Sequence, residues 1–334
     1  MKALVAVKRD KTFDTFFSKD NIKYAESLGE IVWLDTLTAT PEELKEKIKD
    51  CDAYITCWGS PGLTSELLNA APKLKILTHL GSSVAPVVCP EMAERDIKVI
   101  SGFDYFSKST AEGVIAYILA ALRDIPFYNY RLKNEKIWNT PDDFTDSLIY
   151  KTVGIVGFGG VGKYVVQMLQ NFDVNIKVYN RSPISEDVKQ KFRFTQCPIE
   201  EVFSTSDIVS LHLPHNDGTH HSIDDKLLSL IKQGGLFVNT SRGAVVDEAA
   251  MIDHLEKGHF KAALDVYEKE PIDMNSPLLS LDNVLLLPHQ AGVTVNLRAV
   301  LTKDLLKETA DFVDNGAPLK NEILMSKAKN MSKA

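Results

Sequence analysis

A glycine-rich segment near the middle of the chain most narrows the fold that this sequence can adopt. Residues 151–163 read KTVGIVGFGGVGK, in which an aliphatic run precedes glycines with the spacing G-x-G-x-x-G, and an apolar helical pattern follows over residues 164–169. In a strand–turn–helix of this kind, one glycine turns the chain, one lets a pyrophosphate approach the backbone, and one lets helix and strand pack closely. The segment predicts a dinucleotide-binding turn, with a glycine-rich turn that binds nothing as the alternative. The predicted binding residues are Gly157, Gly159, Gly160, Val161 and Gly162.

Composition narrows the class of protein further. The chain has 334 residues, 44% of them hydrophobic and 25% charged, which indicates a globular protein of two domains. A net charge of -7 gives no electrostatic case for a nucleic-acid partner. The four cysteines lack metal-like or disulfide-like spacing, so we expect no metal site. The N-terminus has too short an apolar run for a signal peptide, and the longest apolar block, residues 114–122, is too short to span a membrane. We expect a cytoplasmic protein without a membrane partner.

Short aliphatic runs alternate with helical patterns along most of the chain. In the first half the expected strands are residues 3–7, 30–34, 53–58, 75–80 and 98–101. In the second half they are residues 152–156, 175–179, 192–195, 207–213, 235–240, 260–266 and 283–287. Strict alternation of strand and helix predicts an α/β fold with two doubly wound parallel sheets.

The helical patterns add boundaries and connections. Helices are expected over residues 42–49 and 65–71 in the first half. One long helix is expected over residues 109–129, where Ser109 and Glu112 fit a capping box, and would connect the two halves. A last amphipathic helix is expected over residues 295–314, and the tail from residue 326 is small, polar and expected to be disordered.

Asn180, Arg181 and Ser182 follow the strand after the glycine turn, at the position that would read the adenosine ribose. NAD-binding proteins place an acid there for the 2′-hydroxyl, whereas NADP requires its absence. Asn180 does not repel a 2′-phosphate, Arg181 can pair with it, and Ser182 can donate to it. The pattern favours NADP(H) over NAD(H), although Arg181 as an ordinary surface residue is the alternative.

Three more segments, in order, match a known family. They are residues 239–243 (NTSRG), 264–271 (LDVYEKEP) and 288–289 (PH). Together with the glycine turn, they make the chain closely resemble the D-isomer-specific 2-hydroxyacid dehydrogenases over nearly its whole length. Residues 109–112 with Arg123, and Trp138, also resemble this family's interdomain helix and the segment after it.

The resemblance implies a catalytic set of Arg242, Glu270 and His289. Arg242 would bind the substrate carboxylate and contact the carbonyl oxygen, because a guanidinium can form two parallel hydrogen bonds with a carboxylate. His289 would exchange a proton with the substrate oxygen, and Glu270 would orient its ring. Each has a structural alternative: a salt-bridge partner for Arg242, a turn residue for Glu270 and a loop histidine for His289.

The resemblance also implies the remaining contacts. Asp265 would hold the nicotinamide carboxamide, and the other cofactor-lining residues would be Leu213, Pro214, Thr240 and Gly292. Backbone amides near Gly81 and Ser82 would bind the substrate carboxylate. His215, His220 and His221 invite comparison with a metal site, but a solvated loop explains them better because no cysteine or ordered carboxylate set accompanies them.

Departures from the family pattern bear on the substrate, and they make Trp58 a candidate substrate-binding residue together with Gly81 and Ser82. Where phosphoglycerate dehydrogenases carry arginines for the substrate phosphate, this chain has Trp58, which cannot neutralise a phosphate, and it stops soon after the last helix. Both points weigh against 3-phosphoglycerate and favour a small 2-keto acid such as glyoxylate or hydroxypyruvate, reduced to the D-2-hydroxy acid. The Glu–His pair argues against a formate dehydrogenase. A non-enzymatic dinucleotide-sensing scaffold, as in the corepressors that share this fold, is the alternative function.

The resemblance finally implies the domain organisation. A flavodoxin-like substrate domain would comprise residues 1–102 and 295–334, and a Rossmann cofactor domain residues 103–294. The active cleft would lie between the domains, and two chains would form a homodimer around the cofactor domains and the long helix.

Overall fold

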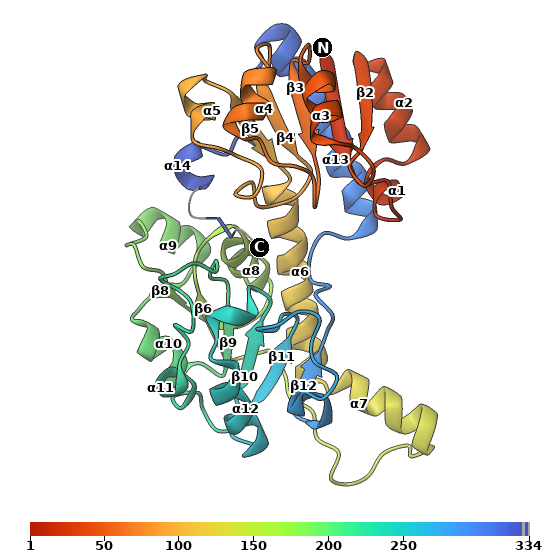
Figure 1. The fold of residues 1–334 in the computed structure, drawn as a ribbon. Coiled ribbons are helices and arrows are strands. Elements are labelled where there is room, and N and C mark those ends of the chain that lie inside the picture. The colour runs from red at the N-terminus through yellow and green to blue at the C-terminus, as the bar shows by residue number, and fades with distance from the viewer. Residues whose placement is uncertain (329–330, 333–334) are drawn as a thin grey trace. The chain divides into compact units, whose positions relative to one another are not determined.

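The computed structural model describes residues 1–328 and 331–332, and the chain divides into two compact units. Unit 1 is Met1–Phe106 with Val293–Ala334, and unit 2 is Ser107–Gly292 (Figure 1). The bounds expected from the sequence, residues 102 and 295, lie a few residues from these. Among the described residues, no helix combines the length and apolar character needed to cross a membrane.

The described residues of unit 1 form a five-stranded sheet in the order β2-β1-β3-β4-β5. Every pair of neighbouring strands is parallel. The chain order reverses between β1 and β3, and ligands of such sheets bind outside the carboxyl ends of the strands at a reversal of this kind. The strands are β1 (Lys2–Val7), β2 (Glu30–Asp35), β3 (Ala53–Thr56), β4 (Ile76–His79) and β5 (Lys98–Ser101).

Helices cover both faces of this sheet because alternate strand residues point to opposite sides. Leu4 and Tyr54 belong to the core on one face, and Val5 and Ile55 to the core on the other. The helices are α1 (Phe13–Phe16), α2 (Lys19–Ser27), α3 (Pro41–Ile48), α4 (Ser65–Ala70), α5 (Glu91–Glu94), α13 (Val295–Asn315) and α14 (Met325–Ala328). The prediction of a disordered tail is wrong for α14, whose Ala328 is buried in the core that contains Leu4 and Tyr54.

The long helix predicted over residues 109–129 differs from the helix observed. α6 (Phe103–Leu122) begins six residues earlier, so Ser109 lies inside it, and its hydroxyl donates to the Gly292 carbonyl at 3.1 Å rather than capping. α6 ends at Leu122 because Asp124 adopts a left-handed backbone with a φ of 46°, and α7 (Ile125–Tyr130) then starts anew. The capping box predicted at Ser109 and Glu112 is therefore wrong.

Unit 2 holds a seven-stranded sheet in its described residues, in the order β12-β11-β10-β9-β6-β7-β8. All of its neighbouring strands are parallel. The order reverses between β6 and β9, the arrangement of a dinucleotide-binding sheet. The strands are β6 (Thr152–Val156), β7 (Asn175–Tyr179), β8 (Thr195–Gln196), β9 (Ile208–Leu211), β10 (Leu236–Asn239), β11 (Lys261–Leu264) and β12 (Val284–Leu286).

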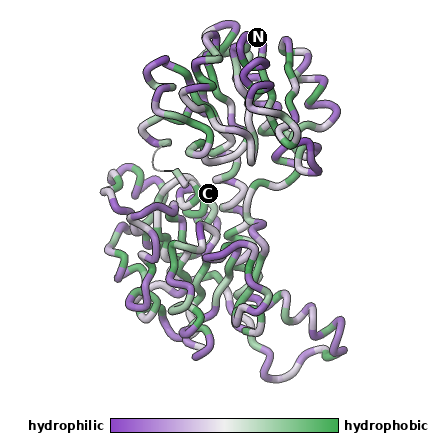
Figure 2. The backbone as a smooth tube through the Cα atoms, viewed as in Figure 1, coloured by the Kyte–Doolittle hydropathy of each residue, from purple (hydrophilic) through white to green (hydrophobic). Residues whose placement is uncertain are grey.

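Two hydrophobic clusters fill the faces of the second sheet, and the hydrophobic strands can be followed in Figure 2. The strand expected over residues 192–195 is largely wrong, because Phe192 ends a helix and packs its ring in the core. The helices of unit 2 besides α6 and α7 are η1 (Arg131–Glu135), α8 (Gly160–Leu169), α9 (Glu186–Phe192), α10 (Ile199–Thr205), α11 (Asp225–Leu228), η2 (Gly243–Val245), α12 (Glu248–Glu256) and η3 (Pro277–Ser280). The two doubly wound parallel sheets confirm the predicted fold class.

Candidate active site

The glycine turn lies between β6 and α8, at the reversal of the second sheet. Gly157 has a φ of 101°, which favours glycine, and a Cβ there would lie 2.7 Å from the His212 carbonyl oxygen after β9. A Cβ on Gly162 would lie 2.1 Å from the Gly157 carbonyl oxygen, so α8 packs against the turn only without a side chain. Gly157 thus turns the chain, and Gly162 lets α8 pack closely on that turn.

The same turn offers room and donors for an anion. A Cβ on Gly159 would meet nothing within 4 Å. In the described part of the chain, the amides of Gly160 and Val161 in the first turn of α8 have no acceptor. Free amides at a helix N-terminus bind phosphate groups, so these residues fit the pyrophosphate of a dinucleotide.

The end of β7 is tied directly to the glycine turn. The Asn180 side chain accepts from the Phe158 amide at 3.3 Å and donates to the Ser182 carbonyl at 2.9 Å. Arg181 and Ser182 are exposed, and the Arg181 guanidinium forms no ion pair or hydrogen bond with the described residues. Asn180 therefore shapes the loop, whereas Arg181 extends to solvent.

The end of β9 lies beside the turn as well. Leu213 Cδ2 is 3.1 Å from the position of a Gly157 Cβ, and Pro214 follows it. His212, to which the sequence analysis gave no role, contacts Ser210 Oγ through Nε2 at 3.0 Å, and burial lowers its pKa to about 3. His212 Nδ1 and Thr240 Oγ1 are fully enclosed without a hydrogen-bond partner among the described residues. Leu213 therefore lies beside the glycine turn, and its predicted place at the cofactor stays a prediction.

Arg242 follows β10 on a tightly held loop. The buried side chain of Asn239 donates to the Arg242 carbonyl at 3.1 Å and accepts from the Ser241 amide at 3.0 Å. Arg242 Nη1 donates to the Ser241 carbonyl at 2.7 Å, and burial lowers the pKa of the guanidinium from its usual range. A Cβ on Gly243 would lie 1.8 Å from the Tyr267 carbonyl carbon. The Arg242 loop therefore packs directly on the backbone after β11.

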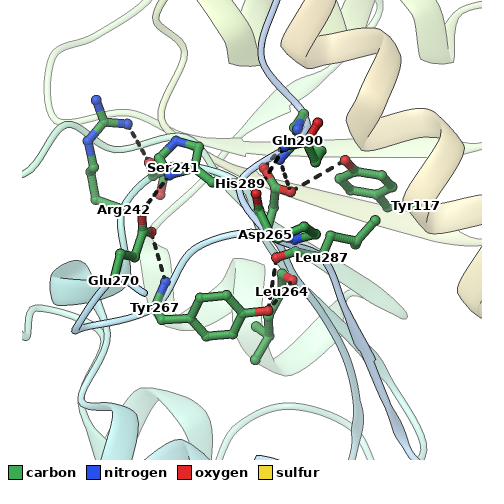
Figure 3. A network of polar contacts seen from close by, with 12 residues as sticks. Tyr117, Ser241, Arg242, Leu264, Asp265, Tyr267, Glu270, Leu287, His289 and Gln290 are labelled. Atoms are coloured by element: carbon green, nitrogen blue, oxygen red, sulfur yellow. Dashed lines mark hydrogen bonds and ion pairs between the residues drawn. The ribbon is translucent and has the colours of Figure 1, made fainter. Parts of the chain in front are cut away.

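Glu270 and His289 form a close pair (Figure 3). His289 Nδ1 and Glu270 Oε2 are 2.7 Å apart, and Glu270 Oε1 accepts from the Tyr267 amide at 3.2 Å. His289 has a φ of 56°, and its amide donates to the Asp265 carbonyl at 2.9 Å. A carboxylate only accepts hydrogen bonds, so Nδ1 carries a proton and Nε2 is the nitrogen available to a substrate.

Asp265 anchors the turn that carries His289. Its carboxylate accepts from the amides of Gln290 at 2.7 Å and Ala291 at 2.9 Å. The Tyr117 hydroxyl of α6 contacts it at 3.4 Å (Figure 3). Burial, with 1% of the residue exposed, raises the pKa of this carboxyl group. The described contacts thus give Asp265 a positioning role besides the predicted one at the cofactor, and Gly292 directly follows this turn.

The predicted substrate residues belong to unit 1. Gly81 and Ser82 follow β4, and Trp58, with 41% of its surface exposed, follows β3. The Trp58 ring packs edge-on against Phe16 and Phe106, at centroid distances of 5.3 and 5.7 Å. The Arg298 guanidinium lies 5.1 Å from the Trp58 ring centroid. Trp58 borders a cavity that α1 and the segment after β1 also line. The Trp58 side chain is therefore fixed by its aromatic neighbours, and its role at the substrate stays a prediction.

The histidine-rich loop forms local pairs. His215 Nε2 lies 3.3 Å from His220 Nδ1, and His221 Nε2 lies 2.9 Å from Glu268 Oε1. Within the part of the chain that the structure describes, no three histidine, cysteine or acidic residues are grouped so as to hold a metal ion.

Comparisons with known proteins identify the family of the chain. The family profile described as "D-isomer specific 2-hydroxyacid dehydrogenase, NAD binding domain" matches residues 115–291. A glyoxylate reductase of Korarchaeum cryptofilum is 32% identical over 285 residues, covering 84% of this chain and 85% of the relative. A D-3-phosphoglycerate dehydrogenase of Methanocaldococcus jannaschii is 34% identical over 277 residues, covering 83% of this chain and 52% of the relative.

A solved structure shares the fold. An acyclic imino acid reductase, in complex with NADPH and D-Arg, superposes with a TM-score of 0.78 at 26% identity, covering 97% of this chain and 100% of the other. The chain belongs to the D-isomer-specific 2-hydroxyacid dehydrogenase family. It is an NAD(P)-dependent D-2-hydroxyacid dehydrogenase. The family and the class of enzyme predicted from the sequence are confirmed.

Proposed function

We propose that this enzyme reduces a small 2-keto acid of the glyoxylate or hydroxypyruvate kind to the D-2-hydroxy acid with NADPH. The 2.7 Å contact between His289 and Glu270 carries the proposal, because it leaves one imidazole nitrogen to exchange a proton with the keto oxygen. When bound, the dinucleotide supplies the hydride for the keto carbon. Unit 2 would hold it as the cofactor domain, and unit 1 would be the substrate domain.

Each residue of the site has a defined task in this proposal. His289 gives its Nε2 proton to the keto oxygen, and Glu270 stabilises the imidazolium that precedes this transfer. Arg242 binds the substrate carboxylate and stabilises charge that develops on the keto oxygen. The tight packing of Gly243 against Tyr267 holds Arg242 close to the segment that carries Glu270. In oxidation the same groups act in reverse, with His289 as the base.

The substrate class is supported by Trp58 and by the relatives. Trp58 is held by Phe16 and Phe106, and its own side chain is apolar where an arginine would carry a charge; the Arg298 guanidinium lies against its ring. The Korarchaeum relative is named a glyoxylate reductase. The non-enzymatic scaffold considered from the sequence gains no support from these relatives.

Turnover of a keto-acid panel tests the function. Purified protein is mixed with NADPH and glyoxylate, hydroxypyruvate or pyruvate, and the loss of NADPH absorbance is followed. We expect turnover of at least one acid, and a loss of activity in Arg242→Ala and His289→Ala while both variants still bind NADPH. No turnover with any acid, or unchanged turnover in both variants, would contradict the proposal.

The preference for NADPH rests on Arg181. The end of β7 lacks the acidic residue that NAD-binding proteins place there, and the Arg181 guanidinium has no partner among the described residues. We expect Arg181→Ala to raise the KM for NADPH by about 10-fold or more, since charge-assisted hydrogen bonds contribute about 1.5–3 kcal/mol, and to leave the KM for NADH nearly unchanged. Arg123→Ala, another exposed arginine of unit 2, is the matched control. Equal effects on both cofactors would overturn the preference.

A homodimer is also proposed. Large apolar side chains are exposed on α7 and the segment after it, among them Phe127, Trp138 and Phe144. Exposed aromatic residues that gather on one segment mark protein–protein contacts. Sedimentation of the purified protein tests this, and a monomer at micromolar concentration would contradict it. The cytoplasmic location stays a prediction.

A further inference from the structure

A buried histidine lies under the predicted substrate loop of unit 1. His79 is the last residue of β4, pairs in register with Thr56 of β3, and has 4% of its surface exposed. Its Nδ1 lies 3.0 Å from the Thr56 hydroxyl. This pair is placed at the carboxyl ends of two central strands, where ligands of doubly wound sheets bind.

The ring of His79 closes against the loop itself. A Cβ on Gly81 would lie 2.3 Å from His79 Nε2, so the imidazole occupies the space that any other residue at position 81 would need. Because no positive φ is involved, it is the ring and not the backbone that calls for glycine at this position. His79 Nε2 is therefore held at the loop backbone.

The loop carbonyls are occupied, whereas its amides are not. The Gly102 amide donates to the Gly81 carbonyl at 3.0 Å, and the Ser101 hydroxyl donates to the Ser82 carbonyl at 3.1 Å. Within residues 1–328 and 331–332, the amides of Gly81 and Ser82 have no acceptor. Two backbone donors and the imidazole thus lie at one short loop, an arrangement that suits an anion.

The contact with Thr56 bears on the tautomer of His79. The Thr56 hydroxyl lies 3.0 Å from His79 Nδ1 and 3.4 Å from the Thr78 carbonyl oxygen, and it has one proton to donate. In the tautomer in which Thr56 donates to Nδ1, the neutral ring carries its proton on Nε2. Burial favours the neutral ring and lowers its pKa to about 4. Nε2 has no hydrogen-bond partner among the described residues, and it is not one of the fully enclosed polar atoms.

We propose that His79 Nε2 donates a hydrogen bond to the carboxylate of the keto acid, beside the amides of Gly81 and Ser82. The inference rests on the proposed function, since it assigns a ligand to the same substrate loop. It makes His79 a substrate-binding residue, in the tautomer in which Thr56 donates to Nδ1 and Nε2 carries the proton. His79 takes no part in the proton transfer of His289.

Two variants separate the effect of the N–H donor from the effect of the size of the side chain. His79→Leu keeps an apolar side chain of similar size without a donor, whereas His79→Gln keeps an N–H donor. The probe is oxamate, a carboxylate analogue of small keto acids, titrated into the NADPH-bound enzyme. We expect His79→Leu to weaken oxamate binding by about 10–100-fold, as for loss of a hydrogen bond to a charged group, and His79→Gln to stay within about 5-fold of wild type.

The kinetics and a measurement on the unaltered protein complete the test. The KM for the keto acid should rise in His79→Leu, while kcat and the affinity for NADPH stay within about 2-fold of wild type. If His79→Leu does not fold, the Nε2–H proton resonance of His79 in wild type should shift when oxamate binds. Oxamate affinity in His79→Leu equal to wild type, equal weakening in both variants, or an unmoved resonance would overturn the inference.

Failure of this inference differs from failure of the proposed function. If wild type binds oxamate and reduces keto acids but His79→Leu behaves alike, only the role of His79 is wrong. If wild type with NADPH neither binds oxamate nor reduces any keto acid, the proposed function itself is wrong, and the inference is overturned with it.

Discussion

In both units a histidine lies at the carboxyl end of a central strand and next to a glycine, but the two contacts differ in kind. In unit 2, the backbone carbonyl of His212 faces Gly157, and a Cβ on Gly157 would lie 2.7 Å from that oxygen. In unit 1, the imidazole of His79 faces Gly81, with 2.3 Å between Nε2 and the position of a Cβ. Packing of backbone against backbone shapes the strand end in unit 2, and a side chain shapes the strand end in unit 1.

The difference suggests what each end can recognise. A turn built from backbone atoms provides the same amides to any dinucleotide, and it therefore leaves a spacing that is readable in a sequence. A loop whose donor is a side chain depends on the residues around it, here Thr56 and Gly81. We therefore expect the unit 2 turn to tolerate fewer changes and the unit 1 loop to adapt to its ligand.

The largest effect is expected from the glycine turn. A Cβ on Gly162 would lie 2.1 Å from the Gly157 carbonyl oxygen, which cannot move without shifting β6 or α8. We expect Gly162→Ala to lower the free energy of unfolding by about 2–4 kcal/mol, measured by urea denaturation without cofactor. Gly159→Ala is the matched control, because its Cβ meets nothing within 4 Å. It should cost less than about 1 kcal/mol and instead weaken NADPH binding. Equal stabilities of the two variants would contradict this view of the turn.

A comparable effect is expected from acid. Burial lowers the pKa of His79 from 6.5 to about 4, so in this interval the unfolded chain binds a proton that the folded chain does not. The free energy of unfolding should therefore fall as the pH drops from about 6.5 to 4, by up to about 3 kcal/mol from His79. Urea denaturation at several pH values should give a shallower loss for His79→Gln. His212 remains in that variant, with its own pKa lowered to about 3. Identical pH profiles would show that His79 is not the buried titrating group.

A smaller effect is expected where a side chain can yield. Gly81→Ala presses a methyl group against the His79 ring, a side chain rather than the backbone, so we expect a loss of about 1–2 kcal/mol. In the His79→Ala background the added methyl group should cost almost nothing, giving a coupling energy of about 1 kcal/mol or more in a double-mutant cycle of urea denaturation. Additive effects would mean that the ring does not occupy this space.

Much of the fold follows from the sequence because alternation of aliphatic runs and helical patterns has few solutions. The errors arise where local signals compete. Ser109 and Glu112 have the spacing of a capping box, yet the apolar residues before them extend α6 back to Phe103. Phe192 reads as the start of a strand, but its ring completes the core from the end of α9.

The candidate site likewise contains residues that the sequence points to and contacts that it does not reveal. Arg242, Glu270 and His289 lie in segments whose order resembles a family, and the structure places the last two 2.7 Å apart. The contact between Tyr117 and Asp265 joins residues 148 positions apart, which no local pattern reveals. His79 also escaped sequence reasoning, because a single histidine at the end of an apolar strand looks like a core residue.

The most direct test of the account measures kcat and KM for glyoxylate in two variants, with NADPH saturating. His289→Asn should lower kcat by about 100-fold or more, since it removes the proton donor, while NADPH binding is unchanged. His79→Leu should instead raise KM and leave kcat within about 2-fold of wild type. Wild-type kcat in His289→Asn would contradict the central claim that the end of the unit 2 sheet carries the chemistry.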